Sequence, residues 1–144
     1  MSTDETVERE LDNAGLVKGA FGGALVGMIG NVVTYFGAKA AGVALVAQLQ
    51  GPAGPAVELG AAQVAIASVV PAVGAALLAL ALNRFTRRPA MIFTVIAAVF
   101  GLLSLGGPAN LGGASTGMKL ALVVMHAISG VAITLGVTRL GRRR

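Results

Sequence analysis

Long apolar segments, each bounded by charged residues, dominate the chain. The uncharged runs cover residues 19–38, 40–57, 59–83, 89–118 and 120–138. A helix needs about 20 predominantly apolar residues to cross a bilayer, so length alone allows five membrane spans. Two of the runs also contain sequences that break helices, which changes this count.

The second run cannot form a continuous helix, because residues 48–55 hold two glutamines and the sequence Gly-Pro-Ala-Gly-Pro. Alternation over residues 43–47 favours a short strand or an interfacial segment, which could fold back through residues 56–59 as a small hairpin. The sequence equally allows the outer loop over residues 38–59 to be a re-entrant segment or to be disordered.

The fourth run is too long for one span, and the Gly- and Pro-rich residues 106–113 are expected to end its helix early. The prediction is therefore an all-α membrane protein, a four-helix transmembrane bundle over residues 15–138. Its predicted spans are residues 15–37, 60–83, 90–106 and 117–138.

Composition supports a membrane protein. Of the 144 residues, 56% are apolar and only 12% are charged, with a mean hydropathy of +0.83. Soluble domains carry about 25% charged residues, and a soluble monomer with half that charge would leave large apolar patches in water. An ordinary soluble enzyme or secreted domain is excluded.

Basic residues predict the orientation. Of the eleven Lys and Arg residues, only Lys39 and Lys119 lie on the side opposite the termini. Because cytoplasmic loops carry the excess of basic residues, both termini are predicted to be cytoplasmic, as an acidic tail over residues 1–14 and a basic tail over residues 139–144. The residues expected to set this orientation and to contact anionic lipid are Arg84, Arg87, Arg88, Arg139, Arg142, Arg143 and Arg144.

These basic residues do not form a stripe interleaved with aromatic side chains, so nucleic acid is not a predicted partner. The expected partners are the lipid bilayer and either a second copy of the chain or another membrane protein.

The first span carries Gly15, Gly19, Gly23 and Gly27 at every fourth position. Small residues at this spacing let two helix backbones approach closely in lipid. The ridge is predicted to pack against another helix of the same chain, with a neighbouring subunit or a substrate path as alternatives. Small-residue stripes are also expected on the second span (Ala61, Ala65, Ser68, Ala72, Ala76, Ala79) and on the fourth (His126, Gly130, Thr134, Thr138).

Three polar residues are predicted to share one depth. At about 1.5 Å per residue, Asn31, Ser68 and His126 each lie roughly 10 to 12 Å from the outer end of their spans. Because unpartnered polar groups in lipid are costly, we expect them to meet or to line one small wet cavity. A hydrogen-bonded cluster that holds the helices together is favoured over a ligand or permeation site and over an oligomer contact.

Pro71 lies inside the second predicted span and removes the hydrogen bond to the carbonyl of Ala67. A kink, and with it a hinge, is expected there. The freed carbonyl needs a substitute donor in lipid, for which Ser68 and Ser129 are the candidates.

The chain has no Cys and one His, and its predicted spans hold no Asp or Glu. Proton- or cation-coupled transport generally relies on intramembrane carboxylates, and a Ser–His pair lacks the acidic third member of a hydrolytic site. Neither catalytic residues nor a metal site nor a resident cofactor is predicted. A haem held by His126 from two subunits is a weak alternative.

Several segments together resemble a known family. They are residues 83–89, 93–97, 106–108 and 120–127, with Met125-His126 as the most specific element, together with Pro71. They are similar to small four-span membrane proteins from actinobacteria that form a domain of unknown function, and the resemblance covers about residues 15–140. It implies four spans in a bacterial inner membrane, and it brings no activity.

The predicted function is that of a non-enzymatic integral membrane protein, an interaction or accessory subunit that associates through small-residue helix faces. The alternative is a small channel or carrier for a neutral or weakly polar solute. In that case Asn31, Ser68 and His126 would form its polar level and Pro71 its hinge.

Overall fold

The computed structural model describes residues 12–48 and 54–142, and these form an almost entirely helical protein. The predictions for the acidic tail up to residue 11, the loop residues 49–53 and the last two arginines lie outside the described residues. The elements in chain order are α1 (Asn13–Ala40), β1 (Val46–Ala47), β2 (Val57–Glu58), α2 (Ala61–Phe85), α3 (Pro89–Ser104), α4 (Gly106–Ala109) and α5 (Thr116–Leu140).

In the described part of the chain four helices are long and apolar enough to cross a membrane, as many as the spans that the sequence predicts. They are α1, α2, α5 and the continuous segment Pro89–Ala109, which joins α3 to α4. The expectation that the Gly- and Pro-rich sequence ends the third helix is wrong in part, because a short helix, α4, follows at once. Pro108 is tolerated there since it lies in the first turn, where a backbone N–H has no helical partner.

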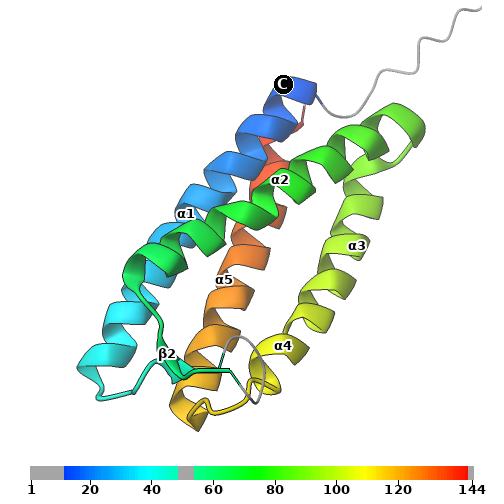
Figure 1. Cartoon of the computed structure of the whole chain (residues 1–144). Coiled ribbons are helices and arrows are strands. Elements are labelled where there is room, and N and C mark those ends of the chain that lie inside the picture. Colours follow the sequence, from blue (N-terminus) through cyan, green and yellow to red (C-terminus); the bar gives the residue numbers. More distant parts are fainter. Residues whose placement is uncertain (1–11, 49–53, 143–144) are drawn as a thin grey trace, which may run out of the picture.

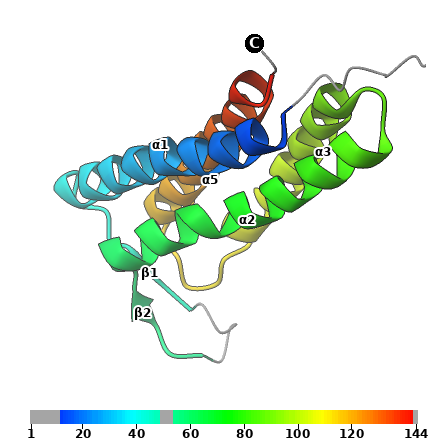
Figure 2. The same ribbon diagram turned by 90° about the horizontal axis from the view of Figure 1, so that it is seen from above.

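α1 and α5 lie side by side and make the most extensive helix–helix packing of the described residues (Figures 1 and 2). α2 packs against α1 on the other side, and α3 packs more sparsely against α5 and α2. Figure 2 shows α3 set apart from α1, beside α2 and α5. The result is a bundle in which α3 is the least enclosed helix.

Side chains define where the helices begin. Asp12 caps α1 by accepting a hydrogen bond from the backbone N–H of Gly15 at 2.8 Å, and Ser115 caps α5 by accepting one from Met118 at 3.1 Å. These short polar side chains satisfy N–H groups that have no partner within the helix. Pro89 occupies the first turn of α3, where its fixed φ favours the helix.

The small hairpin allowed by the sequence is formed. β1 and β2 pair antiparallel with Val46 opposite Glu58 and Ala47 opposite Val57. An ion pair between Lys39 and Glu58, at 2.9 Å, fastens β2 to the end of α1. This loop also contacts the turn before α5, where the N–H of Gln48 donates to the carbonyl of Gly112 at 3.2 Å.

The opposite end of the bundle gathers both described chain ends and the α2–α3 turn (Figure 1). The N–H of Asp12 donates to the carbonyl of Gly141 at 2.8 Å, and the side-chain amide of Asn83 donates to Oδ1 of Asn13 at 2.8 Å. The described basic residues predicted to set the orientation belong to the segments at this end: Arg84, Arg87, Arg88, Arg139 and Arg142.

Candidate functional site

The glycine ridge of α1 lies against α5 of the same chain. A Cβ added to Gly19 would collide with the carbonyl of Gly136, and one added to Gly23 would lie 2.7 Å from the Cα of Ile133. The ridge continues at both ends, with Gly15 against the last turn of α5 and Gly27 against Ser129. Backbone meets backbone along this line, so the ridge is occupied within the chain.

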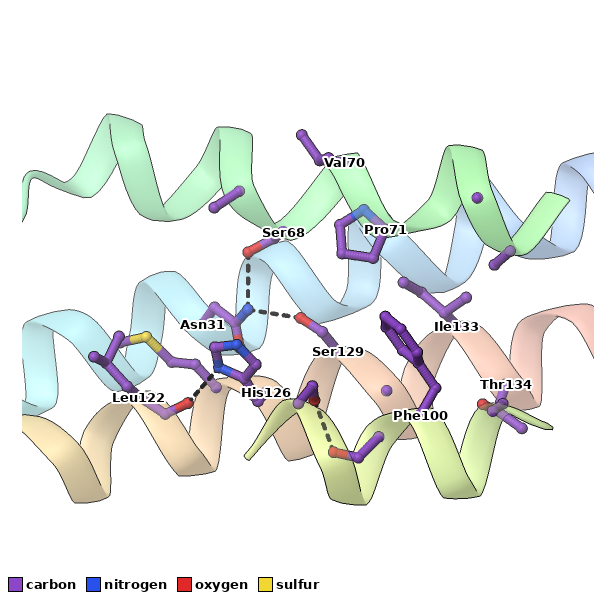
Figure 3. Close-up of a pocket in the computed structure, with 18 of the residues that line it drawn as sticks. Asn31, Ser68, Val70, Pro71, Phe100, Leu122, His126, Ser129, Ile133 and Thr134 are labelled. Atoms are coloured by element: carbon purple, nitrogen blue, oxygen red, sulfur yellow. Dashed lines mark hydrogen bonds between the residues drawn. The ribbon is translucent and has the colours of Figure 1, made fainter. Parts of the chain in front are cut away.

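A buried hydrogen-bonded cluster joins three helices directly beyond this ridge. The side-chain amide of Asn31, on α1, donates to Oγ of Ser68 on α2 and to Oγ of Ser129 on α5, both at 2.8 Å. Asn31 and Ser68 are 4% and 3% exposed. Figure 3 shows Asn31 between the two serines. The polar cluster, as we name these three residues, links every helix that contacts α1 extensively.

The sequence placed Asn31 and Ser68 at one level, and the structure brings them into direct contact. The sequence offers Ser129 as a donor to the carbonyl of Ala67 but does not predict that it belongs to this cluster. The sequence does hold a signal for this membership, because Ala121, Met125 and Ser129 are spaced four residues apart and therefore share one face of the helix.

That face corrects the expectation for the fourth span. The expected stripe through His126, Gly130 and Thr134 is not the packed face of α5, because His126 and Gly130 are exposed. The structure instead buries the neighbouring stripe: Met118, Ala121, Met125, Ser129, Ile133 and Val137. On α2 the expected stripe is largely buried, at Ser68, Ala72, Ala76 and Ala79.

His126 does not take part in the hydrogen bonds of the polar cluster within the described residues. Its Nδ1 lies 2.8 Å from the carbonyl oxygen of Leu122, one turn earlier on α5. A carbonyl can only accept, so Nδ1 must carry the proton. In the neutral ring, Nε2 is then left as an acceptor on the exposed side of α5.

A pocket of about 610 Å³ brings these groups together. Residues of α2, α3 and α5 line it, together with Asn31 of α1 and Leu59 of the loop before α2. Ser68, His126 and Ser129 line it as well, so the residues of the predicted polar level share one cavity (Figure 3). The volume lies within the range of about 300 to 1,000 Å³ that is typical of small-molecule sites.

The lining of the pocket is mainly apolar. Among the lining residues Phe93 and Ile133 are buried, whereas Val70 and Phe100 are 64% and 71% exposed. In Figure 3 the ring of Phe100 extends from α3 towards α2 and α5. Apart from His126, no described residue that lines the pocket has an ionisable side chain.

One polar atom in this setting has no hydrogen-bond partner among the described residues. It is Oδ1 of Asn31, which is fully buried. Buried side-chain oxygens are nearly always hydrogen-bonded to protein or to ordered water. This oxygen has less than 1 Å² of accessible surface, so it is buried behind the wall of the cavity although other atoms of Asn31 line it.

Pro71 also lines the pocket, and α2 continues as a helix through it. The expectation that Ser68 serves the freed carbonyl of Ala67 is wrong, because the hydroxyl of Ser68 donates to the carbonyl of Val64 at 2.7 Å. Ala67 is itself a lining residue, and its carbonyl lacks the usual helical donor since proline has no N–H.

Over residues 12–48 and 54–142 the fold is all-helical, and four of its helices are long and apolar enough to span a membrane. These helices indicate a multi-pass membrane protein. The chain belongs to a family of unknown function (DUF6069), whose family model matches residues 12–143. No curated protein and no solved structure matches the chain.

Proposed function

We propose that this protein is a non-enzymatic multi-pass membrane protein that binds a small neutral molecule in the pocket between α2, α3 and α5. The observation that carries the proposal is the apolar pocket of about 610 Å³, whose lining includes a few polar side chains, among them Asn31, Ser68 and His126. A few convergent polar groups in an otherwise apolar cavity are typical of small-molecule sites. A carrier or channel for a weakly polar solute would also have to bind its solute at the depth of Asn31, Ser68 and His126.

The hydroxyl of Ser68 supports a role without catalysis. Ser68 uses its only hydroxyl proton on the carbonyl of Val64, and His126 is 2.8 Å from a carbonyl of its own helix through Nδ1. A nucleophilic serine needs a base that accepts its proton, and Ser68 has none in this arrangement.

The pocket proposal can be tested by filling the cavity. A Cβ added to Gly130 has no atom within 4 Å, and Gly130 lines the pocket, so Gly130→Leu should occupy it without disturbing helix packing. Gly37→Leu is the matched control, because Gly37 also has open space but does not line the pocket.

The protein would be reconstituted in liposomes with a photoreactive neutral probe, a twelve-carbon alkane that carries a diazirine. We expect saturable labelling of Phe93 and Ile133 in the wild type and in Gly37→Leu, and its loss in Gly130→Leu. Labelling of these two residues that does not saturate in the wild type would contradict the proposal.

We further propose that both termini are cytoplasmic and that the membrane is the plasma membrane of a bacterium. The basic residues of the α2–α3 turn and of the end of α5 support the orientation, because cytoplasmic ends carry the excess of Lys and Arg. The resemblance to small actinobacterial membrane proteins supports the location.

A second candidate function is an accessory subunit that associates with a copy of itself or with another membrane protein. The observation that favours it is an apolar stripe on the outer face of α3, separate from the pocket: Met91, Val95, Val99 and Leu102. The glycine ridge is occupied by α5, so association would have to use a different surface such as this one.

Disulfide cross-linking of engineered single cysteines can show whether this stripe contacts a second copy or only lipid. The test is possible because the chain has no native cysteine. If the subunit role is right, Val99→Cys forms a disulfide-linked dimer in membranes, whereas Val33→Cys, on the outward face of α1, does not. Equal yields at both positions, or none at either, would contradict association through α3. A haem subunit would give a Soret band in the same purified protein, and we expect a colourless preparation.

A further inference from the structure

We infer that the ligand of the pocket is a single-chain neutral lipid, which consists of one long aliphatic chain and a small uncharged polar end. The chain lies extended along α2, α3 and α5, with its polar end towards the β1–β2 hairpin. This inference rests on the proposed function and adds the chemical class of the ligand and its direction in the pocket.

The pocket is a long groove that follows the helices. Its lining on α2 reaches from Gln63 to Leu78, a distance of about 22 Å at 1.5 Å per residue. On α5 the lining reaches from Leu122 to Thr134, or about 18 Å. A compact ligand would leave one end of such a groove empty, whereas an extended chain follows its whole length.

The groove is too narrow for a helix. A volume of about 610 Å³ spread over about 22 Å gives a mean cross-section of about 27 Å² and a width of about 6 Å. An α-helix with its side chains is about 10 to 12 Å wide. A transmembrane helix of a partner or of a second copy therefore does not fit, and the occupant has to be thinner, as a single aliphatic chain is.

Three glycines keep the groove open, one on each of its helices. Gly74, Gly101 and Gly130 all line it, and a Cβ added to any of them would have no atom within 4 Å. They differ in this from Gly19 and Gly23 of the ridge, whose added Cβ atoms would meet the backbone of α5. The space beside the three glycines is therefore not used for packing within the described residues.

Polar side chains of the lining are concentrated from the polar cluster towards the hairpin. Gln63 lies about 7.5 Å from Ser68 in this direction along α2, and His126 lies about 4.5 Å from Ser129 along α5. Ser104, the last residue of α3, also belongs to the lining. These side chains include donors and acceptors, so this half of the groove suits a polar end without selecting one functional group.

The polar end of the ligand has to be uncharged. In the described lining His126 is the only ionisable side chain, and an unpaired charge in an apolar cavity is strongly disfavoured. A carboxylate, phosphate or ammonium group would have no side chain of fixed opposite charge to pair with in this part of the structure.

The half of the groove towards the α2–α3 turn is mainly apolar. Leu78, Phe93 and Ile133 line it, and Thr134 adds one hydroxyl. A buried water needs two to four polar partners, so water is not a stable filling here. An empty space would forfeit van der Waals contacts. An aliphatic tail fills this half, which directs the polar end of the same molecule towards the hairpin.

Exposed lining residues give the groove a side that faces lipid. Val70, Ile96 and Phe100 belong to α2 and α3, and all three are exposed and apolar. α3 packs only sparsely against α2, and Figure 2 shows α3 beside α2 and α5 and set apart from α1. A lipid can therefore enter the groove from the bilayer without passing through water.

The test uses two monoacylglycerols with a sixteen-carbon chain. One carries a diazirine near the glycerol end (the proximal probe), and the other carries it near the methyl end (the distal probe). Each is titrated onto the protein in liposomes, and labelled residues are identified by mass spectrometry. We expect saturable labelling of Gln63 and Leu122 by the proximal probe, and of Leu78 and Phe93 by the distal probe.

A variant tests whether the chain occupies the apolar half. Gly74→Leu fills this half, and its Cβ meets no other atom within 4 Å. It should abolish labelling of Leu78 and Phe93 by the distal probe. An eight-carbon proximal probe should still label Gln63 with unchanged half-saturation, which also shows that the variant is folded. Gly37→Leu, at an open position outside the lining, is the matched control and should behave like the wild type.

The outcomes are distinguishable. Saturable labelling of the same residues by both sixteen-carbon probes overturns the inference, and so does an exchange of their two labelling patterns. Distal labelling of Leu78 and Phe93 that persists in Gly74→Leu overturns it as well. In each of these cases the proposed pocket function stands. If neither these probes nor the twelve-carbon alkane labels the pocket saturably, both the inference and the proposed function fail.

Discussion

Gly19 on α1 and Gly136 on α5 lie in backbone contact, and a Cβ on either one would collide with the carbonyl of the other. The two positions are far apart in sequence, so this approach joins the first and last helices of the chain. Without a hydrophobic driving force between helices in lipid, close van der Waals packing of this kind is a main source of association. The contact therefore identifies the α1–α5 pair as the centre of the bundle.

Adding a methyl group at this contact should destabilise the protein. Gly19→Ala and Gly136→Ala each force the two backbones apart, and overpacking costs about 1 to 3 kcal/mol. The measurement is thermal unfolding of the purified protein in detergent.

Gly37→Ala is the control for these two variants, because nothing lies within 4 Å of its added Cβ. It should stabilise α1 slightly, by about 0.5 to 1 kcal/mol, since alanine loses less backbone entropy than glycine. Equal effects at Gly19 and Gly37 would show that the α1–α5 backbone contact is not as close as described.

The polar cluster should stabilise the bundle modestly. Ser68→Ala and Ser129→Ala each remove one acceptor from the Asn31 amide, and interhelical hydrogen bonds in membrane proteins average about 0.6 kcal/mol. Thr94→Ala is the control, since its hydroxyl bonds only the carbonyl of Ala90 in its own helix at 2.8 Å. Reversible unfolding would be followed for all three, and a loss at Thr94 as large as at the serines would argue against an interhelical role.

Replacing Pro71 should stabilise α2. Pro71→Ala restores an N–H donor to the carbonyl of Ala67, and proline inside a helix costs about 3 kcal/mol or more. Pro89→Ala is the matched control, because Pro89 lies in the first turn of α3, where no helical bond is lost. An increase in melting temperature for Pro71→Ala alone is expected, and no increase would mean that another group already satisfies this carbonyl.

The proposed orientation can be tested in intact cells with the cysteine-free chain as background. Ala56→Cys lies in the loop between β1 and α2, and Phe85→Cys lies at the opposite end of the bundle with 79% exposure in the native residue. A membrane-impermeant maleimide should label Ala56→Cys directly and Phe85→Cys only after lysis. The reverse pattern would place the termini outside.

Part of the site could be predicted from the depth of its residues along their spans. Asn31 and Ser68 lie at the same distance from the ends of their spans because helices rise by a constant amount per residue, and this brought them to one level. Depth does not specify rotation about the helix axis, however. His126 shares the level but lies on the exposed side of α5, one helical position away from the buried face of Met125 and Ser129.

The sequence by itself determined the number and approximate limits of the spans, because a bilayer requires uninterrupted apolar length and charges and glycine–proline segments mark where that length ends. It also determined that the first span has a small-residue ridge. Only the tertiary structure decided which face of each helix is buried, and that the ridge meets α5. In lipid both faces of a helix are apolar, so hydropathy carries little information on rotation, and shape and hydrogen bonding between helices decide it instead.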